Sequence, residues 1–210
     1  MADPTRIGAL IPAAGRSRRM GRAKPLLPLG GSDFIGCILE TLRRHAPEVE
    51  PVVVIRRYGD HVLAERLDRM AESWLSVATV DDGPGDMLRS VRVGGALLRD
   101  AVGGLVWPVD VPSVTGTTIR SVLNAALLRP DRVVQPLSGG QTGHPTYVPR
   151  PLLGPGVSAG DDAGLRGVLA AAPQPPLEVV VEDRFSLMNV NTPEDYKILQ
   201  GWLRREGPTV

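Results

Sequence analysis

The sequence predicts an α/β protein with three layers, in which helices cover both faces of a doubly wound, mostly parallel sheet. Short apolar runs alternate with longer segments whose apolar residues recur at helical spacing, a pattern typical of parallel sheets. The 24 glycines and 20 prolines indicate many tight turns around this scaffold. In such sheets ligands bind beyond the carboxyl ends of the strands, so the loops there are the first candidates for function.

The predicted strands are short apolar segments. Residues 7–11 form an apolar run that stops at Pro12, and residues 52–55 form a second one; both are typical of strands buried on two faces. The apolar segment 105–110 ends in an acid and contains Pro108, which favours a strand end or an edge. Residues 25–31 are expected to be extended. The remaining predicted strands are 75–80, 133–134, 146–148 and 177–181.

The predicted helices carry apolar residues at intervals of three and four. In residues 34–44 these are Phe34, Ile35, Ile38, Leu39 and Leu42. The last helix opens at Thr192, which can cap it, with Pro193 in the first turn and acidic residues beside the positive helix end. The other predicted helices are 60–70, 87–98, 115–128 and 164–172.

Composition limits the kinds of protein this chain can be. Hydrophobic residues make up 42% and charged residues 22%, so we expect one domain over residues 1–205 with a flexible tail at 206–210. The net charge of +1 argues against binding to nucleic acid or a membrane surface. The single cysteine, Cys37, excludes an intrachain disulfide and is expected to be buried. Since no signal-peptide pattern and no apolar run of about 20 residues is present, a cytoplasmic location is expected.

The loop after the first predicted strand has the composition of a phosphate-binding loop. Residues 13–24 read Ala-Ala-Gly-Arg-Ser-Arg-Arg-Met-Gly-Arg-Ala-Lys. Small residues let the backbone approach a ligand, and the arginines and Lys24 add charged donors. The chain has only one other lysine, Lys197. Because both the P-loop ending and the Gly-x-Gly-x-x-Gly fingerprint are absent, composition alone allows a triphosphate loop or a solvated basic loop.

The order of residues in this loop resembles the signature of the MobA-like nucleotidyltransferases, Leu-Ala-Ala-Gly-x-Ser-x-Arg-Met-Gly-x-x-Lys. The continuation at residues 24–30, Lys-Pro-Leu-Leu-Pro-Leu-Gly, looks like the branch that makes the cytosine dinucleotide form of the molybdenum cofactor. In order and spacing the resemblance runs from about Ile7 to about Leu199, and it implies a nucleotide-diphospho-sugar transferase-like fold.

The resemblance implies a loop wrapped around a nucleoside triphosphate. Arg19 and Lys24 would be catalytic, because they neutralise charge on the α-phosphate and the departing pyrophosphate. Residues 85–90 resemble a family segment that lies along the base and ribose, although a helix start explains them as well. The residues assigned to nucleotide binding are Ala13, Ala14, Gly15, Arg16, Ser17, Arg19, Lys24, Asp86 and Ser90.

Two further segments imply a magnesium site. Residues 108–112 resemble the family's Pro-x-Asp-x-Pro, whose acid, here Asp110, binds Mg²⁺; a hard cation prefers such oxygen ligands. Residues 189–195 resemble a run whose second variable position, here Asn191, supplies another oxygen near the metal. The asparagines at 189 and 191 are more common in the guanylyl branch, which leaves CTP and GTP open. A turn and a helix N-terminus are the structural alternatives for these segments.

Two segments imply contacts with the acceptor substrate. Gly143-His144-Pro145 resembles a family segment near the acceptor, and the alternative for His144 is a turn histidine satisfied by backbone. Residues 160–166 resemble Gly-Asp-x-Gly-x-Arg and assign Asp162 to the acceptor, whereas a capped short helix explains them equally well.

These residues imply a nucleotidyltransferase of the EC 2.7.7 type. An acceptor phosphate attacks the α-phosphorus of CTP and pyrophosphate leaves, with positioning and charge neutralisation supplied by Lys24, Arg19 and a Mg²⁺ ion on Asp110. The expected acceptor is molybdopterin, and a molybdoenzyme or its chaperone is an expected partner. GTP as donor and a sugar or polyol phosphate as acceptor are alternatives. A non-catalytic nucleotide-binding partner of a molybdoenzyme is a rival, and a dinucleotide-binding dehydrogenase is a weaker one.

Overall fold

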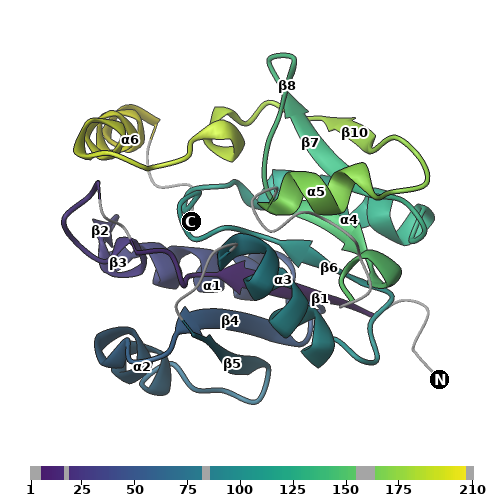
Figure 1. Cartoon of the computed structure of the whole chain (residues 1–210). Coiled ribbons are helices and arrows are strands. Elements are labelled where there is room, and N and C mark those ends of the chain that lie inside the picture. The colour runs from purple at the N-terminus through teal and green to yellow at the C-terminus, as the bar shows by residue number, and fades with distance from the viewer. Residues whose placement is uncertain (1–5, 17–18, 82–85, 155–163, 207–210) are drawn as a thin grey trace.

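The computed structural model describes residues 6–16, 19–81, 86–154 and 164–206, and Figure 1 shows its arrangement. Eight strands form the main sheet, and β2 (Pro28–Leu29) pairs with β3 (Ser32–Asp33) in a separate small hairpin. The main-sheet strands are β1 (Ile7–Pro12), β4 (Val52–Arg57), β5 (Leu75–Val80), β6 (Gly103–Val106), β7 (Val134–Ser138), β8 (Gln141–Thr142), β9 (Thr146–Pro149) and β10 (Leu177–Val180).

The strand order reverses in the interior of the sheet. The order is β10-β7-β9-β6-β1-β4-β5, with β8 paired to β7. The pairs among β6, β1, β4 and β5 are parallel, and β9 is antiparallel to both of its neighbours. The chain runs from β1 outward to β5 and then returns to β6 on the other side of β1. The order therefore reverses between β1 and β6, and ligands bind at the carboxyl ends of strands at such a point.

Helices lie on both faces of the sheet, which confirms the three-layer prediction (Figure 1). Successive residues of β1 point to opposite faces: Ile11 belongs to one buried cluster and Leu10 to another. Helices α1 and α4 pack together, as do α3 and α5. The helices are α1 (Phe34–His45), α2 (His61–Asp68), α3 (Asp86–Leu97), α4 (Gly116–Leu128), α5 (Gly164–Ala170) and α6 (Pro193–Glu206).

The strand predicted at residues 105–110 was placed wrongly. Strand β6 covers Gly103–Val106, so Asp110 lies beyond the strand in the following turn. The strand begins with two glycines, which are weak strand formers, so its start was not predicted. The reason for glycine is tertiary: a Cβ at Gly103 would lie 2.4 Å from the Tyr147 hydroxyl oxygen. The prediction that Pro108 marks a strand end agrees with this placement.

Other differences are local. Part of the segment predicted as extended is a 3-10 turn, η1 (Lys24–Leu26), and two further 3-10 turns, η2 (Arg150–Leu152) and η4 (Arg184–Leu187), were not predicted. Helix α6 includes Glu206, one residue beyond the predicted domain end, while residues 207–210 lie outside the described part. None of the helices in the described ranges combines the length and apolar character needed to cross a membrane.

Candidate functional site

A cavity of about 150 Å³ opens at the reversal point between β1 and β6. Ala14 and Gly15 line it, directly after β1, and Lys24 enters from η1. Met87 and Ser90 enter from α3, the helix that follows β5. The lining is completed by the prolines and the turn after β6: Pro12, Pro25, Pro108, Val109 and Asp110.

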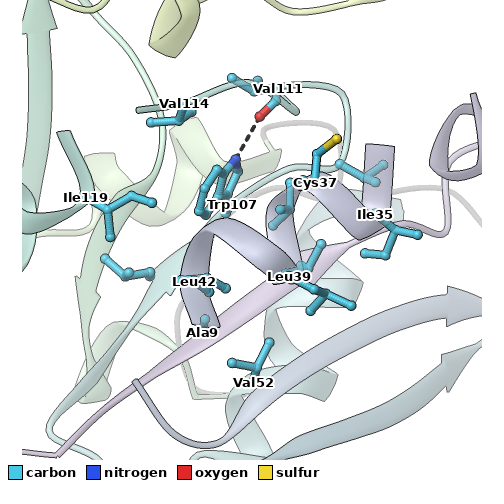
Figure 2. Close-up of a cluster of buried hydrophobic side chains, with 14 of the residues drawn as sticks. Ala9, Ile35, Cys37, Leu39, Leu42, Val52, Trp107, Val111, Val114 and Ile119 are labelled. Atoms are coloured by element: carbon cyan, nitrogen blue, oxygen red, sulfur yellow. Dashed lines mark hydrogen bonds between the residues drawn. The ribbon is translucent and has the colours of Figure 1, made fainter. Parts of the chain in front are cut away.

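Hydrogen bonds from buried core residues hold the turn that carries Asp110. The N–H of Trp107 donates to the carbonyl of Leu10 at 2.9 Å, which continues the pairing with β1 past the end of β6. The Trp107 indole is fully buried, and its Nε1–H donates to the carbonyl of Val111 at 2.8 Å (Figure 2). The N–H of Val111 donates to the carbonyl of Pro108 at 3.1 Å. Trp107 is therefore a core residue whose ring nitrogen also supports the Asp110 turn.

Lys24 links the two residues predicted to bind metal. Its Nζ donates to Oδ1 of Asn191 at 2.7 Å and lies 3.5 Å from Oδ2 of Asp110. The side chains of Lys24 and Asp110 are 14% and 24% exposed. Three polar side chains from distant parts of the chain thus meet beside the cavity, two of which, Lys24 and Asp110, line it.

Asn191 is fixed by its neighbours on both sides. The N–H of Val190 donates to the carbonyl of Asp110 at 2.8 Å, so the two segments are joined through their backbones. Oδ2 of Asp195 accepts from the N–H groups of Asn191 at 2.9 Å and Thr192 at 2.8 Å. Burial raises the pKa of Asp195, but these hydrogen bonds, the Thr192 side chain and the charge of Lys24 together lower it by more, so that the pKa lies below its usual range. The predicted Thr192 cap is present, since its hydroxyl accepts from the N–H of Asp195 at 3.2 Å.

The donor atoms at this rim fit a hard divalent cation. Asp110 and Asn191 offer one carboxylate and one amide oxygen, and Mg²⁺ commonly takes few protein ligands, with phosphate and water completing its shell. Among the described residues no group of three or more His, Cys, Asp or Glu side chains could hold a metal by itself. The arrangement therefore suits a metal that arrives with a phosphate ligand.

A second cavity, of about 600 Å³, adjoins the first and shares Met87, Pro108 and Asp110 with it. His144 stands in its wall. Burial lowers the pKa of His144, against the opposing effects of Asp110 and the Val106 carbonyl, which favours a neutral imidazole. Its Nδ1 is buried and has no hydrogen-bond partner in the described part of the chain. The remaining lining residues are Gln135, Thr142, Gly143, Leu165, Arg166, Leu169 and Asn189.

The residues predicted to bind the nucleotide do not all lie at the cavities. Ala13 lies in the core, and its N–H donates to the carbonyl of Ile55 at 2.8 Å, so it offers no donor to a phosphate. Arg16 and Arg19 are exposed on the loop, and neither is among the described residues that line the two cavities. Asp86 is the first residue of α3. Ser17 and Asp162 lie outside the described residues.

Two residues that shape the site were not predicted from the sequence. Gln135, on β7, lines the second cavity. Asp183 is buried and caps η4 through its bond from the N–H of Phe185. An acid two residues before an aromatic is a weak capping signal. The other partners of Asp183, at Thr115 and Thr118, are 68 and 65 residues away and leave no local pattern.

Residues 9–176 match the family model described as the MobA-like NTP transferase domain. The chain belongs to the MobA-like NTP transferase family. As a MobA-like NTP transferase it is a nucleotidyltransferase of the EC 2.7.7 type. The predicted fold, that of the nucleotide-diphospho-sugar transferases, is confirmed.

Its relatives include enzymes that use different nucleotides. The molybdenum cofactor cytidylyltransferase of Escherichia coli K12 is 26% identical over 90% of this chain and 93% of that protein. The molybdenum cofactor guanylyltransferase of Sinorhizobium fredii is also 26% identical, over 97% of this chain and 95% of that protein. The crystal structure of Rv0371c from Mycobacterium tuberculosis H37Rv has a TM-score of 0.77 at 25% identity and covers 94% of this chain and 99% of its own; Rv0371c is also known in complex with manganese.

Proposed function

We propose that this MobA-like transferase moves CMP from CTP onto a phosphate of a molybdopterin-type acceptor and releases pyrophosphate, with Mg²⁺ as cofactor. The observation that carries the proposal is the contact of Lys24 with both Asp110 and Asn191, beside two adjacent cavities of which Asp110 lines both and Lys24 lines the smaller one. The smaller cavity lies at the predicted triphosphate loop, so we assign it to the phosphates of the nucleotide, and we assign the larger one to the acceptor. The relatives that act on the molybdenum cofactor support this acceptor.

The chemistry follows from charge placement. When bound, Mg²⁺ would polarise the α-phosphate and orient it for attack, held by Asp110 and Asn191. Lys24 now donates to those same two residues, so we expect it to transfer its hydrogen bonds to phosphate oxygens when the metal–nucleotide complex enters. A compact ammonium group suits this role because it can rotate between partners. The exposed Arg16 and Arg19 would join it on the pyrophosphate.

The test is pyrophosphate release from CTP with molybdopterin and Mg²⁺. We expect Lys24→Ala and Asp110→Asn to abolish turnover. Lys197→Ala and Asp131→Asn are matched controls on exposed side chains and leave turnover unchanged. Nucleotide binding without pyrophosphate release in the wild type would support a non-catalytic partner of a molybdoenzyme instead. Absence of nucleotide binding would contradict both hypotheses.

The donor base is tested separately. The segment at residues 24–30 supports CTP, whereas Asn189 and Asn191 are the features that favour GTP. A thermal-shift panel of CTP, GTP, ATP and UTP with Mg²⁺ compares them directly, because the tightest ligand stabilises the folded state most. A larger shift with GTP than with CTP would contradict the CTP assignment. Protection of Lys24 from a lysine-specific reagent, with Lys197 as internal reference, would locate the bound nucleotide.

A further inference from the structure

The segment from residue 183 to residue 191 touches several of the predicted site residues, although it lies beyond the region matched to the family model. The carbonyl of Ser186 accepts from the N–H of His144 at 2.9 Å, and the N–H of Val190 donates to the backbone carbonyl of Asp110 at 2.8 Å. The side chain of Asn191 accepts from Lys24 at 2.7 Å. The segment therefore contacts residues that line the two cavities: Asp110 lines both, Lys24 the smaller one and His144 the larger one.

One buried carboxylate anchors the segment. Asp183 is 3% exposed, and its Oδ2 accepts from the N–H of Thr115 at 2.9 Å, the hydroxyl of Thr115 at 2.9 Å and the hydroxyl of Thr118 at 2.7 Å. Its Oδ1 accepts from the N–H of Phe185 at 3.0 Å. The first group of bonds ties the segment to the N-terminus of α4, and the last shapes η4. A buried charge with this many donors is well satisfied.

The anchor is connected to the site through short, stiff contacts. The hydroxyl of Ser186 donates to the carbonyl of Asp183 at 2.7 Å, which fixes the residue that holds His144. Gly143 packs directly on this residue, because a Cβ there would lie 2.5 Å from the Ser186 carbonyl oxygen. A shift of η4 would therefore reach His144 without a flexible side chain to absorb it.

We infer that Asp183 is a positioning residue for nucleotidyl transfer: through its bonds to Thr115, Thr118 and Phe185 it fixes residues 183–191, and with them the backbone contacts to His144 and Asp110. Its role in turnover rests on the proposed function. Its role in holding the segment does not, and the two can be tested apart.

Asp183→Asn removes the anchor with little change in shape. An amide has one oxygen and one NH₂ group, so either orientation places NH₂ against a backbone N–H, that of Thr115 or that of Phe185. Rotation of the side chain cannot repair this loss. Asp131→Asn, on an exposed carboxylate, is the matched control for the charge change.

A pair of variants at Thr118 separates positioning from stability. Thr118 is 1% exposed. Thr118→Val keeps its shape and loses the hydroxyl that donates to Asp183, whereas Thr118→Ser keeps the hydroxyl and loses a buried methyl group. If positioning depends on the hydrogen bond, the valine variant is defective and the serine variant is rescued, even where serine lowers the melting temperature more.

Hydrogen exchange of the full chain measures, without any ligand, how firmly residues 183–191 are held. We expect the amides of Val190 and Asn191 to exchange about tenfold faster in Asp183→Asn and Thr118→Val, with β1 and β4 unchanged and with Thr118→Ser and Asp131→Asn like the wild type. The ratio of CTP dissociation constants without and with Mg²⁺ is measured in the same proteins. We expect this metal-dependent gain to fall about tenfold in the two defective variants.

Each result bears on the inference. Unchanged exchange in both defective variants overturns it, and so does a serine variant that behaves like the valine variant. Faster exchange with an unchanged metal-dependent gain also overturns it, because the segment then moves without affecting the site. If the wild type binds no nucleotide while the exchange pattern is as expected, the anchor is supported and the proposed function fails.

Discussion

Replacing Trp107 with phenylalanine tests whether the core sets the geometry of Asp110. The substitution keeps an aromatic ring but removes the Nε1–H that donates to the Val111 carbonyl at 2.8 Å. Because Trp107 is 0% exposed, that carbonyl loses its partner in a buried place, at a cost of about 1–3 kcal/mol. The smaller ring leaves a cavity that adds about 1 kcal/mol. For a chain of this length the total corresponds to a melting temperature lower by roughly 10 °C.

The same change is expected to weaken metal-dependent nucleotide binding. Val111 follows Asp110 directly, so a freed Val111 carbonyl loosens the turn that aims the carboxylate. Loss of a group that orients a metal ligand commonly costs about tenfold or more in metal affinity. The measurement is calorimetric titration with CTP at several Mg²⁺ concentrations, together with a melting curve. Nucleotide affinity without Mg²⁺ should change little.

Trp74→Phe is the matched control. The Trp74 indole is also buried, at 9% exposure, and its Nε1–H donates at 2.6 Å to Oε2 of Glu72. Glu72 is exposed, so its carboxylate can bind water instead, and we expect a smaller loss of stability and no loss of metal-dependent binding. Equal metal-dependent affinity in Trp107→Phe and the wild type would refute the reasoning.

Three further outcomes are expected. Gly15→Ala adds a Cβ that meets no atom within 4 Å, so its melting temperature should match the wild type while CTP affinity falls about tenfold; unchanged affinity would separate this loop from the nucleotide. The pKa of Asp195 is lower in the folded than in the unfolded protein, so the stabilisation from its carboxylate is fully present above the unfolded pKa of about 3.9 and is lost as the pH falls through the folded pKa. In Asp195→Asn, the free energy of unfolding measured with urea should therefore depend less on pH across that acid range. An unchanged pH dependence would contradict this. Burial and two neighbouring carboxylates raise the pKa of Cys37 to about 11, so native protein at pH 8 should react with iodoacetamide far more slowly than unfolded protein, and equal rates would contradict its burial.

The sequence predicted most of the scaffold, because strand and helix periodicities are local. The run at residues 7–11 and the helical spacing from Phe34 both correspond to observed elements. The start of β6 escaped prediction because Gly103 reflects the packing of the Tyr147 ring rather than any strand preference. The turn η4 escaped because Asp183 is held by partners on α4.

The sequence predicted several residues of the candidate site, but not the contacts that these residues make. The order of residues in the loop 13–24 pointed to Lys24, and the Pro-x-Asp-x-Pro pattern at residues 108–112 pointed to Asp110. The structure brings both to one cavity but places Ala13 in the core, because its N–H completes pairing with Ile55. Composition could not reveal this, since an alanine in a loop and one in a core look alike in a single sequence.

By itself, the sequence determined which residues carry charge and roughly where most strands and helices lie, because those properties depend on the residues and their near neighbours. Only the tertiary structure decided that Lys24 contacts partners 86 and 167 residues further along, at Asp110 and Asn191. Those distances depend on strand order and on how the segment beginning at Asp183 docks on α4. Hydrogen bonds between such remote residues form only after the layers have packed, so no local pattern encodes them.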